Sequence, residues 1–340
     1  MRVPLPTASC SDAPIWGIFT SAFHAPALVL ADELGLFRAL AQGPATAAEL
    51  ASRLELELRA VETLAGLMAA LELLVAADDR YHLTEVADAY LVPGRPYYWG
   101  GMLRRMRDNP LDCNKLLAAL RGGRAAAEAR ATSMWEAAAP PAEALVAFTH
   151  AMHAHAFALA MRAVPRLGVG GARRLLDVAG GSGAFAIAAC HHHPALAATV
   201  LDLPPVCAVA ETYAAQYQGG DRVTTAPADM FADAWPGGHD HALFTDIFHD
   251  WDDARCARLA ARARAAVGPG GRVTVHEMLL DDTKAGPRQA VAYSMAMIFS
   301  TQGRQRTAGE LVALLAGAGL VDVTVTPTTG GYAAITGTAP

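Results

Sequence analysis

Residues 175–183 read Leu175-Leu-Asp-Val-Ala-Gly-Gly-Ser-Gly183, an apolar run that meets an acid and then a glycine-rich segment. The apolar run predicts a buried strand, and the residues from Gly183 to Cys190 predict a helix directly after it. Glycine allows a sharp turn and lets a ligand approach the backbone, because it has no Cβ. The segment therefore predicts a strand–turn–helix unit with a ligand at its turn.

Strands and helices continue to alternate after this unit. The pattern predicts further strands at 198–201, 223–226, 241–245 and 271–276, with helices at 206–216 and 253–267. Such alternation is typical of a parallel sheet with helices on both faces. Two late segments, at 321–326 and 331–336, are expected to form an antiparallel pair at one edge. Residues 166–340 are therefore predicted to form a Rossmann-like α/β domain with a mostly parallel, seven-stranded sheet.

Residues 1–165 are predicted to form a separate, helical domain. Thr46-Ala-Ala-Glu49 fits a capping box, which opens a short helix after the breaker Gln42-Gly43-Pro44. Other helices are expected at 27–40, 58–74 and 141–164, and a small hairpin at 73–75 and 81–83. A helix pair followed by a hairpin predicts a winged-helix-like module, which raises the question of DNA binding.

The charge of this module argues against DNA binding. Residues 1–110 carry 13 Asp or Glu and 9 Arg with no Lys, a difference of −4 (9 − 13). The would-be recognition helix, at 59–68, offers a single cation, whereas a DNA reader needs several to pair with phosphates. The whole chain has a net charge of −6, which indicates neither a nucleic acid nor an anionic membrane as partner. We therefore interpret the N-terminal domain as a packing and dimerisation unit.

Composition indicates a folded protein of the cytoplasm. The 340 residues are 53% hydrophobic and 18% charged, which suits two domains with ordinary cores. The cysteines are odd in number and scattered, which indicates reduced thiols rather than disulfides or a structural zinc site: Cys10, Cys113, Cys190, Cys207 and Cys256. Neither an export signal nor an apolar run of membrane-spanning length is apparent. We expect no metal and no membrane partner.

The ligand at the glycine turn has two candidate classes. Gly181-Ser-Gly-Ala-Phe-Ala186 fits the dinucleotide pattern G-x-G-x-x-A, and Asp202 lies where an acid would bind a ribose in either class. Asp177, however, would repel a pyrophosphate, whereas it suits the ammonium and sulfonium cations of S-adenosylmethionine. Asp229-Met-Phe231 adds a carboxylate for the adenine amino group and Met230 for its face. S-adenosylmethionine is therefore the predicted cofactor. The expected cofactor site comprises Asp177, Gly180, Gly181, Gly183, Asp202, Leu203, Asp229, Met230, Phe231 and Thr245.

These motifs resemble one enzyme family. Asp177-Val-Ala-Gly-Gly-Ser-Gly183, Asp202-Leu-Pro204, Phe248-His-Asp-Trp-Asp-Asp253, Gly268-Pro-Gly-Gly271 and Gly303-Arg-Gln-Arg-Thr307 are similar to those of class I O-methyltransferases of the caffeic-acid/hydroxyindole type. The resemblance covers most of the chain, including the winged-helix-like part. It implies a homodimer with interlocking N-terminal helices, in which the partner walls part of each pocket, and it implies a small-molecule acceptor.

His249 is the candidate catalytic base. It follows the fourth predicted strand, at the sheet edge where ligands bind, and Asp250 comes directly after it. A neutral imidazole could take the proton of a phenolic hydroxyl, which is a poor nucleophile while protonated. Glu277 closes the fifth strand and is expected to orient this imidazole. In the resembling plant enzymes a second carboxylate stands where this chain has Gln305, so C-methylation of an activated carbon, in an aromatic amino acid or an α-keto acid, remains an alternative.

The acceptor pocket is expected on two helices. Phe148, Met152 and His155 share one face of the helix at 141–164, at spacings i, i+4 and i+7. Met295 and Phe299 follow Glu277, and methionines and aromatic rings suit a flat ligand, although such residues are also common in cores. Gln305 and Trp135 are further candidates for this wall.

Overall fold

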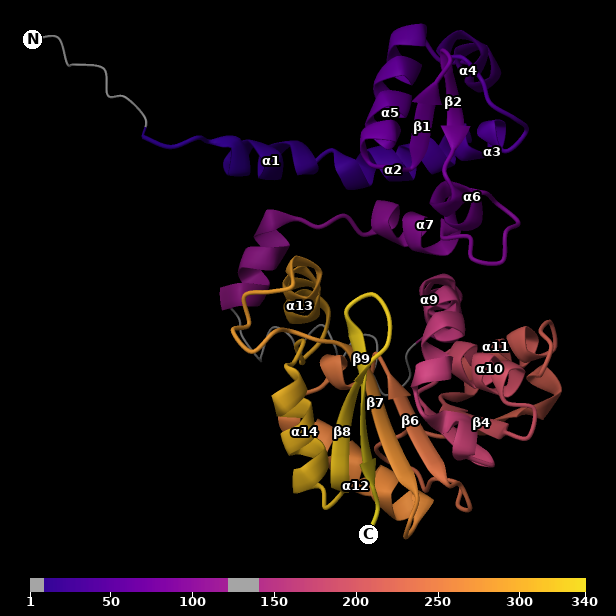
Figure 1. Ribbon diagram of the computed structural model, residues 1–340, viewed down its shortest axis with the longest axis vertical. Coiled ribbons are helices and arrows are strands. Elements are labelled where there is room, and N and C mark those ends of the chain that lie inside the picture. Colours follow the sequence, from indigo (N-terminus) through magenta and orange to yellow (C-terminus); the bar gives the residue numbers. More distant parts are fainter. Residues whose placement is uncertain (1–8, 122–140) are drawn as a thin grey trace, which may run out of the picture. The chain divides into compact units, whose positions relative to one another are not determined.

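The computed structural model describes residues 9–121 and 141–340, in two compact units, Met1–Pro110 and Leu111–Pro340. Figure 1 shows their elements in chain order. The long helix α9 (Ala142–Ala163) belongs to the larger unit, where it packs against α10 and α11, whereas the sequence grouped it with the N-terminal helices. Its buried residues explain this placement, because Phe157 and Leu159 need the core of the larger unit to cover them.

The larger unit is built on a seven-stranded sheet in the described residues, in the order β5-β4-β3-β6-β7-β9-β8. Its strands are β3 (Arg174–Val178), β4 (Ala197–Asp202), β5 (Val223–Pro227), β6 (His241–Thr245), β7 (Arg272–Met278), β8 (Val321–Pro327) and β9 (Tyr332–Thr338). All pairs from β5 to β7 are parallel, and β9 pairs antiparallel with both β7 and β8. The predicted Rossmann-like fold is therefore confirmed.

Helices cover both faces of this sheet (Figure 1). α9, α10 (Ala184–His192) and α11 (Pro204–Ala214) lie on one side, and α12 (Asp253–Val267) and α14 (Ala308–Gly317) on the other. One core cluster joins Leu176 of β3 to Leu259 of α12 and Leu315 of α14, all fully buried. α13 (Arg288–Ser300) follows β7. Chain order reverses between β3 and β6, and such a switch point is where open α/β sheets bind ligands.

The smaller unit is helical with one hairpin, as predicted. It comprises α1 (Ala13–Ser21), α2 (His24–Glu33), α3 (Leu36–Leu40), α4 (Ala47–Leu54), α5 (Leu58–Ala70), β1 (Leu74–Ala77), β2 (Arg80–Leu83), α6 (Glu85–Leu91) and α7 (Gly100–Asp108). The capping box is confirmed, since the Glu49 amide donates to Thr46 Oγ1 and the Thr46 amide donates to Glu49 Oε2. The prediction of one helix at 27–40 was wrong, because Gly35 at φ +82° separates α2 from α3.

Two helical stretches, Ala13–Glu33 and Ala142–Arg166, have the length and hydropathy of a membrane span, contrary to the sequence-based expectation. Length and composition are weak grounds for a membrane span. Half of the most apolar window of the second stretch is buried, as in the core helix of a folded domain. The first stretch is only 6% buried and exposes Ile15, Trp16 and Ile18. It therefore presents an apolar surface that needs a partner.

Candidate active site

The first half of the site is the turn that follows β3. Asp177 ends the strand fully buried, and neither of its carboxylate oxygens has a well-formed hydrogen bond with a residue that the structure describes. A Cβ at Gly180 would lie 2.6 Å from the Asp177 carboxyl carbon, so only glycine fits there. Gly181 and Gly183 have φ values of +58° and +73°, which a side chain would strain. The glycines therefore clear space beside an unpaired acid.

Burial, with a smaller contribution from the nearby charge of Asp202, raises the pKa of Asp177 to about 7, although the Ala186 amide opposes this shift. A carboxylate that lacks donors and sits in a low dielectric favours a cationic partner. The ammonium group of S-adenosylmethionine is such a partner. The residues present at this turn thus fit the predicted cofactor.

Asp202 ends β4 and holds the glycine turn in place. Its Oδ2 accepts from the Gly181 amide at 2.9 Å, and its Oδ1 accepts from the Leu203 amide at 2.7 Å. Burial raises the pKa of Asp202 to about 6, although both amides oppose this shift. The acid therefore joins the glycine turn to the start of α11 at the sheet edge, where the sequence expected a ribose.

The loop after β5 carries the other predicted cofactor residues. Asp229 Oδ1 accepts from the amides of Phe231, at 2.7 Å, and Ala232, at 3.2 Å, so this oxygen caps its own turn. The Phe231 ring meets Trp251 edge-on at 4.9 Å, which gives it a packing role toward α12. Thr245 ends β6. All of these residues lie at or beyond the carboxyl ends of β5 and β6.

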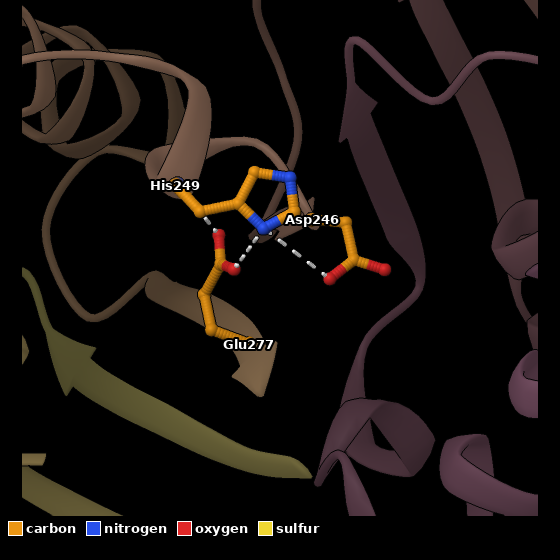
Figure 2. Close-up of side chains that lie close together, drawn as sticks. All are labelled: Asp246, His249 and Glu277. Atoms are coloured by element: carbon orange, nitrogen blue, oxygen red, sulfur yellow. Dashed lines mark hydrogen bonds and ion pairs between the residues drawn. The ribbon is translucent and has the colours of Figure 1, made fainter. Parts of the chain in front are cut away.

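The second half of the site surrounds His249, in the short helix η4 (Phe248–Asp250) after β6. The imidazole is buried, and Figure 2 shows it between the carboxylates of Glu277 and Asp246. Its Nδ1 lies 3.1 Å from Glu277 Oε2 and 3.8 Å from Asp246 Oδ1. Its Nε2 lies 3.6 Å from Asp250 Oδ1. Three carboxylates therefore surround one imidazole, two at Nδ1 and one at Nε2.

Glu277 also fixes the backbone that carries His249. Its Oε1 accepts from the amides of Ile247, Phe248 and His249, at 3.1, 2.8 and 3.3 Å. One oxygen thus holds the loop while the other faces the ring. The orienting position that the sequence predicted for Glu277 matches this geometry.

The three carboxylates around His249 change the pKa values in this cluster. Burial lowers the pKa of His249, but the carboxylates of Glu277, Asp250 and Asp246 more than offset burial and raise it to about 10. Burial raises the pKa of Asp250 to about 6, and His249 opposes that shift. The imidazole is therefore a strong base whose protonated form the surrounding acids stabilise.

Two residues that contact the His249 loop or ring were not predicted from the sequence. Arg306 is buried and donates to the carbonyls of Phe248 and Trp251, at 2.7 and 2.8 Å, so it clamps both ends of the His249 loop. Asp246 directly follows β6 and precedes His249 by three residues. The signal for Asp246 was available, because an acid immediately after a predicted parallel strand lies at the ligand-binding edge.

The structure brings only some of the predicted acceptor residues to His249. Gln305 Nε2 lies 3.4 Å from Nδ1, and the Tyr293 ring stands perpendicular to the imidazole at 5.4 Å between centroids. His155 of α9 reaches this cluster through Asp246, with Nε2 3.8 Å from Oδ2. Three predicted residues are half-buried on α9 and α13: Phe148, Met152 and Met295. The Phe299 side chain and Trp135 lie outside the described part of the chain.

The trio in Figure 2 also has the composition of a metal site. One ligand-type atom from each of Asp246, His249 and Glu277 lies within 4.8 Å of the other two. The structure favours a different interpretation, because Glu277 Oε1 is occupied by three amides and its Oε2 faces Nδ1 at ion-pair distance. The trio therefore has the arrangement of a histidine oriented by acids.

Comparisons with known proteins point in one direction. Residues 114–321 match the O-methyltransferase domain family, and residues 16–93 match the O-methyltransferase dimerisation domain. The chain is 38% identical over 310 residues to the 3-hydroxy-5-methyl-1-naphthoate 3-O-methyltransferase of Streptomyces sahachiroi, which covers 89% of this chain and 88% of that protein. It is 33% identical over 329 residues to the acetylserotonin O-methyltransferase of Bos taurus, covering 91% and 92%.

Among solved structures, the crystal structure of human N-acetylserotonin methyltransferase in complex with SAM is similar to this chain. The TM-score is 0.82 at 25% sequence identity, and the match covers 98% of this chain and 99% of the human one. Both the helical unit and the sheet unit therefore have counterparts in that structure.

Proposed function

Because the chain belongs to the S-adenosylmethionine-dependent O-methyltransferase family, we propose that His249 is the general base that takes the proton from the acceptor hydroxyl. The observation that carries this proposal is the clamp around the ring. Glu277 lies 3.1 Å from Nδ1 and holds the loop through three amides, so Nε2, which Asp250 Oδ1 approaches to 3.6 Å, is the nitrogen proposed to take the acceptor proton. The family assigns the methyl group to a hydroxyl oxygen, not to carbon, which was the alternative that the sequence left open.

The cofactor supplies an electrophilic methyl group on a sulfonium sulfur. We propose that Asp177 holds its ammonium group, because both oxygens of this buried acid lack well-formed hydrogen bonds within the described residues. Asp202 would then bind the ribose hydroxyls while its carboxylate keeps the Gly181 amide in place. Met230 and Asp229 are proposed for the adenine.

The raised pKa of His249 suits a phenolic acceptor. A free phenol has a pKa of about 10, so the neutral His249 ring, whose conjugate acid has a pKa of about 10, accepts its proton at little cost, and this neutral form increases as pH rises. Once the ring is charged, the carboxylates of Glu277, Asp250 and Asp246 stabilise the imidazolium. The remaining contribution is positioning, because the acceptor oxygen must lie in line with the methyl group.

We propose a small hydroxylated aromatic acceptor with a flat ring system. The relative from Streptomyces sahachiroi is named for a hydroxynaphthoate, and Tyr293 offers an aromatic wall 5.4 Å from the His249 ring. The half-buried Met152 and Met295 add polarizable surface, which adapts to a flat ligand.

We further propose a homodimer in the cytoplasm. The family dimerisation domain covers residues 16–93, and Trp16 and Ile18 of α1 are 62% and 74% exposed in the single chain. Burial of this apolar surface in a second copy would stabilise the assembly. The five free cysteines are consistent with a reducing compartment. Light scattering at micromolar concentration tests the dimer, and an active monomer would contradict it.

Rescue by acceptor acidity tests the base. We expect His249→Ala to slow methylation of an ordinary phenol by about 10²–10⁴-fold and to slow methylation of a nitro-substituted phenol, ionised at neutral pH, far less. A mass-spectrometric screen of phenols, naphthols and α-keto acids with isotope-labelled cofactor supplies the acceptors. An equal, small loss for both phenols would remove His249 from the mechanism.

A further inference from the structure

We propose that Asp246 supplies the second carboxylate that aligns His249, at the place where Gln305 leaves the imidazole without one, and that it couples this ring to His155 on α9. Asp246 is thus a positioning residue for the methyl transfer. The inference rests on the proposed function, since it concerns how the proposed base is held.

The contacts of Asp246 support this role. Its Oδ1 lies 3.8 Å from His249 Nδ1 and has no well-formed hydrogen bond with the described residues, although it is buried. Its Oδ2 accepts from the Tyr332 hydroxyl at 3.3 Å and lies 3.8 Å from His155 Nε2. The carboxylate therefore lies between two histidines and is anchored by a tyrosine.

Gln305 occupies a position on the same side of the ring but is neutral. Its Nε2 lies 3.4 Å from Nδ1, and the side chain is almost fully buried. A neutral amide fixes the ring sterically yet adds no negative charge when His249 becomes an imidazolium. Asp246 adds that charge, and it does so at the same nitrogen.

The backbone of Asp246 is arranged for this purpose. It has φ +52°, the left-handed region that few side chains adopt, and its amide donates to the His276 carbonyl at 3.1 Å. A non-glycine residue in this region is strained, and such strain is common at functional positions. The Asp246 carboxylate lies toward the His249 ring (Figure 2).

The other charged or titratable groups around His249 make contacts that differ from those of Asp246. Glu277 of β7 serves Nδ1 and the loop amides, and Asp250 of η4 faces Nε2. Tyr293 of α13 meets the ring edge-on. Beyond Asp246 lie Tyr332 of β9, His155 of α9 and His276 of β7, which act on its carboxylate. Asp246 lies 3.8 Å from both His249 Nδ1 and His155 Nε2, so it links the ring to α9.

A charge-exchange series tests the proposal. The variants are Asp246→Asn, Gln305→Glu and the double variant, with Asp221→Asn, an exposed acid before β5, as the matched control. Asn tolerates the left-handed backbone at position 246, so the fold should survive, and melting temperatures check this. The readouts are kcat, KM for both substrates, and the titration midpoint of His249 followed by ¹⁵N NMR of the imidazole.

We expect Asp246→Asn to lower the limiting kcat, measured at alkaline pH where His249 is neutral, by about tenfold and to lower the His249 midpoint by about one pH unit, with KM for S-adenosylmethionine unchanged. The double variant, in which Gln305→Glu is added to Asp246→Asn, should recover most of the kcat and most of the His249 midpoint, because it returns one negative charge to Nδ1. Asp221→Asn should change neither kcat nor the midpoint. Tyr332→Phe, which removes the anchor but keeps the charge, should lower kcat less than Asp246→Asn does.

An unchanged His249 midpoint in a folded Asp246→Asn protein would overturn the inference. So would a double variant that stays as slow as Asp246→Asn. The first result does not depend on whether His249 is the base, because the NMR midpoint is read without turnover. If instead His249→Ala keeps full activity while the midpoint still responds to Asp246→Asn, the proposed function fails and the electrostatic link stands.

Discussion

Two buried acids at the same edge of the sheet behave in opposite ways. Asp177, at the end of β3, has no well-formed hydrogen bond to either oxygen within the described residues. Glu277, in β7, gives one oxygen to three backbone amides and presents the other to His249 at 3.1 Å. An acid with only a weak hydrogen bond from the protein is available to a ligand, whereas an acid that several amides engage acts on the chain itself. The two halves of the site are therefore predicted to respond differently to substitution.

The largest effect is expected at the base. We expect His249→Ala to lower the methyl-transfer rate by about 10²–10⁴-fold, because the variant loses the imidazole proposed to take the acceptor proton. Affinity for S-adenosylhomocysteine should stay close to wild type, since the Asp177 turn is untouched. Single-turnover kinetics and calorimetry measure the two quantities. A parallel loss of cofactor affinity would show that the two halves are not separable.

The second largest effect is expected at Glu277, the acid proposed to orient His249. We expect Glu277→Gln to lower the limiting rate at alkaline pH, where His249 is neutral, by roughly tenfold, less than His249→Ala, because Oε1 remains for the loop amides while the charge at Nδ1 is lost. Loss of that charge lowers the pKa of His249, which stands at about 10 in the wild type. Since only the neutral ring accepts a proton, the wild-type rate should rise with pH through the neutral range and beyond. The rising limb of the variant should lie at lower pH.

A pH–rate profile measured with saturating substrates checks this assignment. His249→Ala serves as the control, because its profile should lack the limb altogether. A Glu277→Gln profile that superimposes on the wild type would mean that Glu277 acts on the loop alone.

Replacement of Asp177 should weaken cofactor binding and, without ligand, raise the stability of the protein. We expect Asp177→Asn to weaken S-adenosylhomocysteine binding by about 1.5–3 kcal/mol, the usual contribution of a charged hydrogen bond. Asp202→Ala should weaken it by a similar amount through the ribose. Calorimetry measures both, and wild-type affinity in either variant would contradict its assignment.

The effect of Asp177 on stability depends on pH in a direction that follows from its pKa. The pKa of Asp177 rises on folding from 3.8 to about 7. The folded state therefore holds this proton more tightly, and that contribution to stability is lost as pH rises from about 4 through 7. Without ligand, Asp177→Asn should melt higher than the wild type at pH 8 and show little difference near pH 4. A lower melting temperature at pH 8 would mean that the carboxylate is paired without its ligand.

Most strands and helices could be predicted from the sequence, because the patterns that specify them are local. The apolar run at 175–178 and the glycines after it led to β3 and α10, and the capping box at Thr46 led to the start of α4. The break between α2 and α3 was missed, because a lone Gly35 in a helical pattern does not reveal its positive φ.

The site was predicted in part for a related reason. His249 and Glu277 follow parallel strands, so the alternation of strands and helices brings them to one edge. The contact between Asp246 and His155 depends on how α9 packs against the sheet, and no sequence spacing encodes that packing. Arg306 was overlooked because a buried arginine that binds carbonyls has no local sequence pattern.

The smallest effect is expected from metal removal. The trio of Asp246, His249 and Glu277 has the residue types of a metal site, so the ion-pair interpretation needs a test of its own. A divalent cation there would compete with the proton at Nδ1 and would draw Glu277 away from the loop amides. We expect treatment with a strong chelator to leave the methylation rate within about twofold of the untreated enzyme, because base catalysis by an imidazole requires no metal. Addition of Zn²⁺ should inhibit or have no effect, since occupied His249 cannot accept a proton. Loss of activity with the chelator, restored by Zn²⁺ in the wild type but not in Asp246→Asn, would replace the oriented base with a metal centre and would place Asp246 among its ligands.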